Sequence, residues 1–209
     1  MNLRLGLDMD GVFADFDRGY RAVLRQTSGR DLLPDTEPTC WDYDQAAGYT
    51  AAEIQAAWQT IRASKYFWRD LQPYPGAREF LGWLAAYVAG RNWCQGESHE
   101  VCFLTCRDGW NAKGQTEEWL RAHGFYTIPR TVLLAREPKG GLARELHLTH
   151  VVDDSSMQFL DVLEQTVETQ AYLWARPHNT AQQLPTIGAN TVRSFAELEN
   201  LIRQHVEHT

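Results

Sequence analysis

The sequence predicts an α/β protein with a mostly parallel sheet. Apolar runs of strand length alternate along the chain with segments of helical periodicity, which is typical of parallel strands joined by helices. Two of these runs end in carboxylates, in the position where open α/β sheets carry functional groups. With 209 residues, the chain is long enough for one or two domains and for a sizeable core without disulfide support.

The N-terminal half is expected to form one strand and three helices. Residues 3–7 alternate apolar with polar or small side chains and lead into an acidic turn, which predicts a strand. Thr50 is a good helix N-cap, and Glu53 three residues later completes the pattern of a capping box. The expected helices cover residues 13–25, 50–64 and 77–89. Proline and glycine residues predict irregular connections over 28–50 and 66–76.

The C-terminal half begins with a polar loop over 90–100 and then alternates between strands and helices. The expected strands cover residues 101–105, 131–134, 149–152 and 170–174. The expected helices cover residues 116–123, 142–148, 157–166 and 195–205.

Charge and composition exclude several function classes. The chain carries 20 Lys and Arg against 27 Asp and Glu, and none of its apolar runs approaches the length of a membrane span. An acidic chain without a basic block lacks the electrostatic footprint of a protein that binds a nucleic-acid duplex. The four cysteines, and an N-terminus unlike a signal or transit peptide, lead us to expect a reduced, cytoplasmic compartment.

Polar side chains follow four of the expected strands, and the carboxyl ends of parallel strands meet at one edge of a sheet. In chain order these residues are Asp8, Asp10, Thr105, Lys139, Asp153 and Asp154. Clustered carboxylates are stable together mainly around a hard cation such as Mg²⁺. A carboxylate in this position can also attack phosphorus and form an aspartyl-phosphate. Thr105 and Lys139 would then hold the phosphate oxygens.

The same residues resemble the four motifs of the haloacid dehalogenase superfamily of phosphatases. The matching segments are Asp8-Met9-Asp10-Gly11-Val12, Phe103-Leu104-Thr105, Lys139 and Val151-Val152-Asp153-Asp154. More narrowly, residues 8–16 and 67–77 resemble the 5′(3′)-deoxyribonucleotidases. The resemblance covers residues 3–165. It implies a Rossmann-like core over 1–15 and 75–209 with an inserted, mostly helical cap over 16–74.

The resemblance implies a role for each carboxylate. Asp8 would be the nucleophile and a Mg²⁺ ligand. Asp10 would be the general acid and base, with its backbone carbonyl on the metal. Asp153 would complete the metal site. We favour it over Asp154 because adjacent residues of a strand point to opposite faces.

The resemblance also implies phosphate-binding roles for Thr105, Cys106 and Lys139. The second motif departs from the Thr-Ser-Pro that is common in the family. Here Thr105-Cys106-Arg107 replaces a hydroxyl donor with a thiol and adds a cation, which bears on phosphate binding and substrate preference.

Two aromatic residues are candidates for substrate binding. Phe67 and Trp68 lie where the chain leaves the expected cap, and the resemblance favours stacking on a nucleobase over filling the cap core. Asp15 is interpreted as a helix N-cap or hinge residue. The tryptophans interpreted as packing residues are Trp41, Trp58, Trp83, Trp119 and Trp174.

Together these observations predict a Mg²⁺-dependent phosphomonoester hydrolase. The expected substrate is a nucleoside monophosphate, above all a deoxyribonucleotide, as for a 5′-nucleotidase. One alternative is a phosphatase of a sugar phosphate or another small metabolite, and another is a ligand-binding protein of the same fold without turnover. Base preference and the position of the phosphate stay open, and a homodimer is compatible with the sequence.

Overall fold

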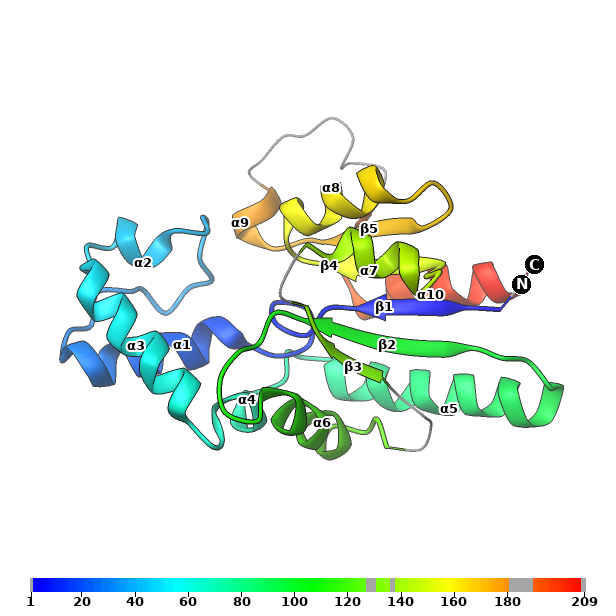
Figure 1. Ribbon diagram of the computed structural model, residues 1–209, viewed down its shortest axis with the longest axis horizontal. Helices are drawn as coiled ribbons and strands as arrows, with labels where there is room; N and C mark the ends of the chain where they lie inside the picture. Colours follow the sequence, from blue (N-terminus) through cyan, green and yellow to red (C-terminus); the bar gives the residue numbers. More distant parts are fainter. Residues whose placement is uncertain (1, 127–130, 136–137, 181–189, 208–209) are drawn as a thin grey trace.

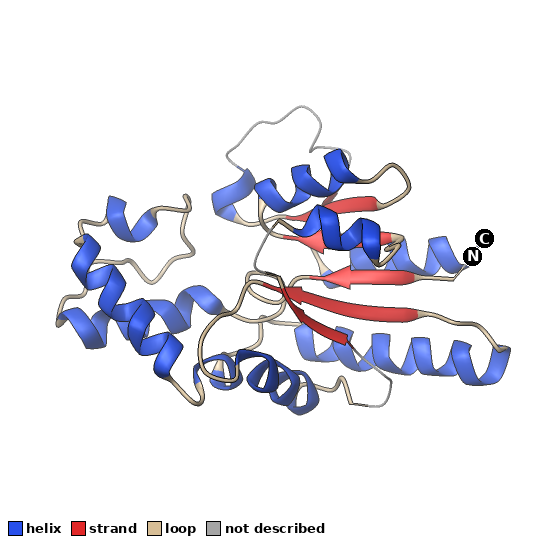
Figure 2. Ribbon diagram, in the orientation of Figure 1, coloured by secondary structure: helices blue, strands red, loops and turns tan. Residues whose placement is uncertain are grey.

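One parallel sheet forms the centre of the computed structural model, which describes residues 2–126, 131–135, 138–180 and 190–207 (Figure 1). Within these residues the strand order is β3-β2-β1-β4-β5-β6, and every neighbouring pair is parallel (Figure 2). The strands are β1 (Arg4–Leu7), β2 (Glu100–Thr105), β3 (Thr131–Leu134), β4 (His150–Asp153), β5 (Gln170–Trp174) and β6 (Thr191–Val192). The predicted α/β class with a Rossmann-like parallel sheet is confirmed.

Helices cover both faces of this sheet and also form a group beyond its edge (Figure 1). The helices are α1 (Phe16–Ser28), α2 (Tyr43–Ala46), α3 (Ala51–Ala63), α4 (Phe67–Asp70), α5 (Ala77–Gln95), α6 (Ala112–Ala122), α7 (Lys139–Glu145), α8 (Ser156–Gln165), α9 (Pro177–Thr180) and α10 (Phe195–Glu207). None of the helices in the described part of the chain has the length and apolar character that a membrane span requires.

Two apolar layers sandwich the sheet because side chains alternate along each strand. On β2, Val101 and Phe103 belong to the layer shared with α5 and α10. Cys102 and Leu104 belong to the layer shared with α7 and α8. All four side chains are buried, so β2 is a central strand covered on both faces.

The helices α1 to α3 lie beyond the carboxyl ends of the strands, where the predicted cap is expected (Figure 1). The chain passes between this group and the sheet twice, and backbone hydrogen bonds join the two connecting segments. Asp15 N–H donates to the Gln72 carbonyl at 2.8 Å, and Tyr74 N–H donates to the Phe13 carbonyl at 2.9 Å. The division at residues 15/16 and 74/75 stays a prediction.

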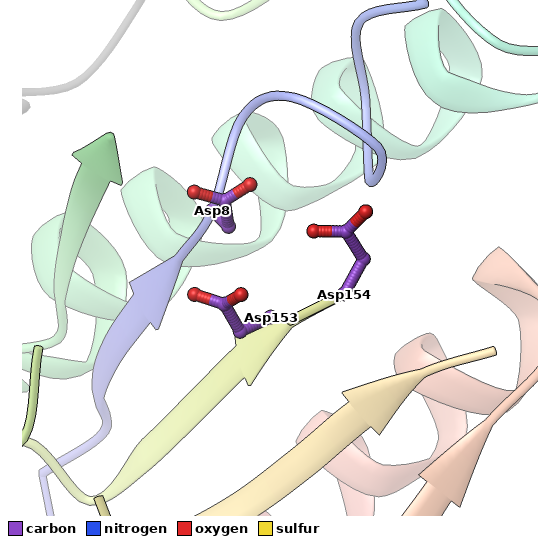
Figure 3. Close-up of side chains that lie close together, drawn as sticks. All are labelled: Asp8, Asp153 and Asp154. Carbon is purple, nitrogen blue, oxygen red and sulfur yellow. The ribbon is translucent and has the colours of Figure 1, made fainter. Parts of the chain in front are cut away.

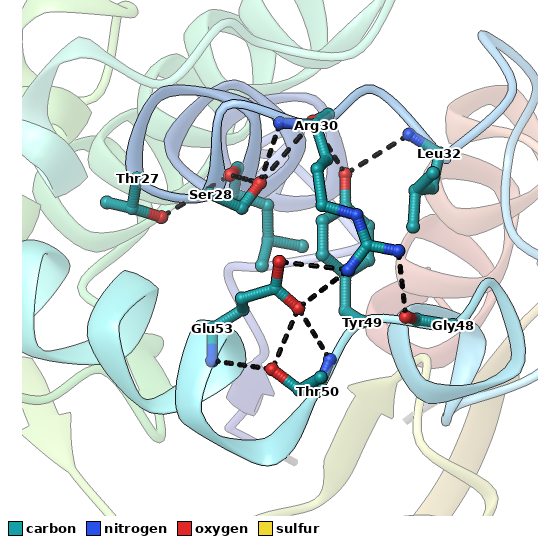
Figure 4. A network of polar contacts seen from close by, with 9 residues as sticks. Thr27, Ser28, Arg30, Leu32, Gly48, Tyr49, Thr50 and Glu53 are labelled. Atoms are coloured by element: carbon teal, nitrogen blue, oxygen red, sulfur yellow. Dashed lines mark hydrogen bonds and ion pairs between the residues drawn. The ribbon is translucent and has the colours of Figure 1, made fainter.

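Polar contacts fix the irregular segment that connects α1 with α3 (Figure 4). The Arg30 guanidinium donates to both oxygens of Glu53 at 3.0 Å and to the Gly48 carbonyl at 3.3 Å. Thr50 and Glu53 form the predicted capping box. Hydrogen bonds from the backbone N–H and the hydroxyl of Thr50 lower the pKa of Glu53 to about 2, and Arg30 contributes to the shift.

The structure differs from the predicted helix boundaries in three places. The helix expected over 13–25 begins at Phe16, because Asp15 is its N-cap and accepts a hydrogen bond from the Arg18 N–H, as predicted for Asp15. Helix α6 begins four residues early, at Ala112. Helix α7 begins at Lys139, so this residue opens a helix instead of lying in a loop.

The loop predicted over 90–100 is wrong for its first half. Helix α5 continues through Gly90 to Gln95 and ends at Gly96, which adopts a left-handed conformation. Asn92 fixes this extension, because its side-chain amide donates to the His99 carbonyl at 2.9 Å and accepts the His99 N–H at 2.7 Å. Gly90 therefore does not end the helix.

Candidate active site

The turn after β1 places two carboxylates at the sheet edge. Asp8 N–H donates to the Val152 carbonyl of β4 at 2.9 Å, and the backbone then turns so that the N–H groups of Phe13 and Ala14 both donate to the Met9 carbonyl. Gly11 sits in this turn with a φ of 80°. A Cβ atom there would overlap the Asp154 carboxylate, so the turn requires glycine for both its conformation and its space.

Three buried carboxylates meet at the carboxyl ends of β1 and β4 (Figure 3). Asp8, Asp153 and Asp154 each offer an oxygen, and these oxygens all lie within 4.8 Å of one another. Both Asp153 and Asp154 therefore lie beside Asp8, and the preference for Asp153 as the metal ligand stays a prediction. Strand β4 ends at Asp153, so Asp154 no longer follows the alternation of the strand.

Burial of this cluster disfavours its charged form. Burial raises the pKa of Asp8 well above its ordinary value, and the neighbouring carboxylates add to the shift against the opposing effect of Lys139. Burial likewise raises the pKa of Asp154 to about 6. A cation bound beside these carboxylates would oppose both shifts.

Lys139 supplies positive charge to this cluster. Its ammonium group donates to Asp8 Oδ1 and, at 2.6 Å, to Asp153 Oδ2. Burial alone would lower the pKa of Lys139, but the two carboxylates raise it above its ordinary value. The Lys139 side chain is only 2% exposed. One ammonium among three carboxylates leaves an all-oxygen donor set with excess negative charge, which fits a hard divalent cation such as Mg²⁺.

Asp10 is not one of these three carboxylates, and it pairs with Arg107. The Arg107 guanidinium donates to Asp10 through Nε at 2.9 Å and through Nη2 at 2.7 Å. Thr105 is fully buried at the end of β2, and its hydroxyl accepts the Arg107 N–H at 3.4 Å. Cys106 is exposed. Cys106 and Arg107, which both belong to the second motif, line a cavity next to these residues.

A cavity of about 470 Å³ connects these polar groups with the helices beyond the sheet edge. Such a volume suits a small-molecule ligand. Asp8, Asp10 and Lys139 line it, and so do the carboxylates of Asp17, Asp42 and Asp44. Its aromatic side chains are Phe16, Tyr20, Trp41, Tyr43, Trp58 and Trp68.

Of the two aromatic residues predicted to bind substrate, Trp68 lines this cavity and Phe67 does not. Trp68 lines it, although its side chain is also buried and its Nε1–H donates to the Asp108 carbonyl at 2.9 Å. Phe67 lies apart from the cavity and lines a second hollow beside Gly19 and Leu71.

Two further aromatic residues line the cavity although the sequence was interpreted as using them for packing. Trp41 is 49% exposed, and Trp58 stacks on Phe16 with ring centroids 5.7 Å apart. Trp119 and Trp174 are buried, as expected of packing residues. No single sequence pattern separates these two pairs, because Trp41 lies in an irregular segment whereas Trp58, like the buried Trp119, lies within a helix.

The chain resembles one known protein family along nearly its whole length. The chain matches the family described as 5′ nucleotidase, deoxy (Pyrimidine), cytosolic type C protein over residues 2–204. A direct comparison with curated proteins finds no match.

Solved structures similar to this chain are hydrolases and dehalogenases of one fold. A haloacid dehalogenase-like hydrolase from Streptococcus pneumoniae is 15% identical, with a TM-score of 0.61 and coverage of 96% of this chain and 98% of the other. A HAD-type hydrolase from Bacillus subtilis bound to magnesium is 13% identical, with a TM-score of 0.57 and coverage of 96% and 98%. The L-2-haloacid dehalogenase from Xanthobacter autotrophicus is 13% identical, with a TM-score of 0.55 and coverage of 97% and 99%. At these identities the likeness concerns the fold.

Proposed function

The chain belongs to the 5′ nucleotidase, deoxy (pyrimidine), cytosolic type C family, and on this premise we propose that it hydrolyses the phosphate ester of a pyrimidine deoxyribonucleoside monophosphate. Membership confirms the resemblance predicted from the motifs and makes the protein an enzyme of the nucleotidase and phosphatase class with a small phosphate ester as substrate. The cytoplasmic location and the homodimer stay predictions.

The observation that carries the proposal is a single cavity lined both by Asp8, Asp10 and Lys139 and by six aromatic side chains. A phosphate group would lie against Asp8 and Lys139, and the base would lie against the aromatic side chains of the same cavity. This arrangement suits a molecule with a charged end and a flat apolar end, as a nucleotide has.

The proposed reaction has two steps. In the first, a carboxylate oxygen of Asp8 forms a bond to phosphorus while the bond to the nucleoside oxygen breaks, and the Asp10 carboxyl gives its proton to that oxygen. In the second, water attacks phosphorus, Asp10 takes a proton from the water, and the bond to Asp8 breaks. Lys139 holds Asp8 in place and offers its positive charge to the phosphate oxygens.

The metal site would be made of the Asp8 and Asp153 carboxylates and the Asp10 backbone carbonyl, with Asp154 as an additional oxygen donor. A bound Mg²⁺ ion would supply positive charge that neutralises the phosphate oxygens during transfer. The excess negative charge of the cluster supports this part of the proposal.

The decisive assay compares a panel of deoxyribonucleoside and ribonucleoside monophosphates with sugar phosphates under identical conditions. The proposal expects the highest kcat/KM for pyrimidine deoxyribonucleotides. A higher kcat/KM for a sugar phosphate would favour the alternative phosphatase. Binding of nucleotides without release of phosphate would favour the non-catalytic alternative.

Removal of divalent cations is expected to abolish activity. After EDTA treatment, Mg²⁺ should restore turnover and Ca²⁺ should inhibit it, because calcium takes more ligands at longer distances and would displace the Asp8 oxygen from its line of attack. Phosphate release measures the effect, and metal analysis of the treated protein is the control. Full activity in protein shown to be metal-free would contradict the proposed site.

Aromatic recognition of the base is tested by two matched substitutions, Trp58→Ala inside the cavity and Phe67→Ala outside it. Loss of a stacking residue costs about 1–3 kcal/mol. Trp58→Ala should therefore lower kcat/KM for nucleotides by roughly 5- to 150-fold relative to acetyl phosphate. Phe67→Ala should leave this ratio unchanged. Equal losses for both substrates in Trp58→Ala would show that Trp58 only supports the cavity.

A further inference from the structure

Arg107 is the residue at which the second motif departs most from the family pattern, and it is almost completely enclosed. Its side chain is 0% exposed, whereas that of its partner Asp10 is 22% exposed. The guanidinium donates to Asp10 through Nε and Nη2, and through Nη1 to the Thr116 hydroxyl at 3.0 Å. Its centre lies 5.2 Å from the centre of the Trp68 ring.

These contacts leave Arg107 poorly suited to bind the substrate phosphate directly. Each of its three guanidinium nitrogens already donates to Asp10 or Thr116, and the indole of Trp68 covers part of the group. A direct contact with phosphate would have to use the second N–H of Nη1 or Nη2, although the Arg107 side chain is 0% exposed. The two parallel hydrogen bonds to one carboxylate make the fixed pair the more stable arrangement.

Asp10 depends on this pair for its position. Among the described residues, every hydrogen bond that the Asp10 carboxylate accepts comes from Arg107. The turn that carries Asp10 fixes its backbone, but the side chain can rotate about its own torsions. Arg107 is in turn held by Thr116 of α6 and by Trp68 of α4, which belong to two different helices.

We propose that Arg107 is a positioning residue that holds the Asp10 carboxyl where it can give its proton to the leaving-group oxygen, and that this inference rests on the function proposed above. The guanidinium itself exchanges no proton. Because Trp68 also lines the cavity, the same contact ties the position of Asp10 to the aromatic wall that receives the base.

The inference predicts a dependence on the leaving group. Proton transfer requires a donor within hydrogen-bond distance of the acceptor, and a misplacement of about 1 Å can cost roughly 100-fold in rate. A nucleoside is a poor leaving group and needs the proton from Asp10 as the bond to phosphorus breaks. A 4-nitrophenolate leaves without protonation. A misplaced Asp10 should therefore slow transfer from the nucleotide much more than transfer from the aryl phosphate.

The test is Arg107→Gln, measured as kcat/KM for a nucleoside monophosphate and for 4-nitrophenyl phosphate. We expect the nucleotide value to fall by about 10- to 100-fold more than the aryl phosphate value. Arg144→Gln is the matched control, since Arg144 forms an exposed pair with Glu145, and neither value should change. Arg107→Lys keeps a charge opposite Asp10 but lacks the planar fork, so it should fold and show a loss in the same direction.

A double substitution separates positioning from a general structural role. In single-turnover reactions with the nucleotide, Arg107→Gln should add no further loss in an Asp10→Asn background, because the group it positions is already gone. An additional loss there, or equal losses for the two substrates in both Arg107 variants, would overturn the inference. Absence of turnover in the unmodified protein on either substrate would instead contradict the proposed function itself.

Discussion

Asp8→Asn is expected to abolish turnover while the protein stays folded. The amide is neutral and is a far weaker nucleophile toward phosphorus than a carboxylate. Asparagine has the same shape, and its carbonyl oxygen can still accept the hydrogen bond from Lys139. The change also removes one charge from a buried cluster in which burial raises the pKa of Asp8, so no loss of stability is expected.

The control for this experiment is Asp10→Asn. A general acid and base contributes about 10² to 10⁴ in rate, so Asp10→Asn should retain a trace of phosphoryl transfer that Asp8→Asn lacks. Steady-state phosphate release measures activity, and thermal unfolding measures the fold. Substantial activity in folded Asp8→Asn would contradict the covalent mechanism.

Lys139→Met is expected to have the largest effect on stability. It leaves the buried carboxylates of Asp8, Asp153 and Asp154 without their ammonium partner, and loss of one partner of a buried pair costs about 3–5 kcal/mol. For a protein of this size, that corresponds to roughly 6–20 °C in Tm. Activity should also be lost, because Asp8 loses the donor that fixes it.

Thermal unfolding with and without Mg²⁺ measures this effect. An ion that binds only the folded state stabilises it, so millimolar Mg²⁺ should recover part of the lost Tm. Lys113→Met is the control, because Lys113 is exposed and pairs with Glu117 on the surface of α6, where an ion pair contributes little. An unchanged Tm in Lys139→Met would mean that the carboxylates are neutral or already compensated in the folded protein.

The sheet and its polar edge could be predicted from the sequence because both follow from local periodicity. An apolar run predicts a strand, and the residue after the run lies at the strand end, whatever the rest of the chain does. This reasoning was sufficient to predict that Asp8, Lys139 and Asp153 lie close together, as they do. It did not predict that Asp154 also lies beside Asp8, because the alternation rule holds only as far as the last paired residue of β4.

Elements of about one period could not be predicted. Helices α4 and α9 have four residues each and strand β6 has two, too few for a helical or alternating pattern to show. On α4, successive side chains differ in direction by about 100°. This is why Trp68 lines the cavity and its neighbour Phe67 does not, a difference that sequence position alone does not carry.

Contacts between segments that are distant in the chain also could not be predicted from the sequence. Arg107 was recognised only as a departure from the family pattern, because its partner Asp10 is 97 residues away and its supports lie on α4 and α6. Trp41 reaches the cavity from the segment between α1 and α3, and Trp58 reaches it from α3 itself. Only the packed chain shows which tryptophans face a cavity and which fill the core.

Acid quenching during turnover of 4-nitrophenyl phosphate labelled in its phosphoryl group tests the central claim most directly, because it detects the covalent intermediate itself and this leaving group needs no proton from Asp10. Asp10→Asn is the suitable protein, since loss of the general base slows the second step and lets the intermediate accumulate. The account predicts a phosphoryl group on the peptide that contains Asp8, released by hydroxylamine and absent when Asp8 is also replaced by Asn. Continued release of phosphate with no label on that peptide would contradict it.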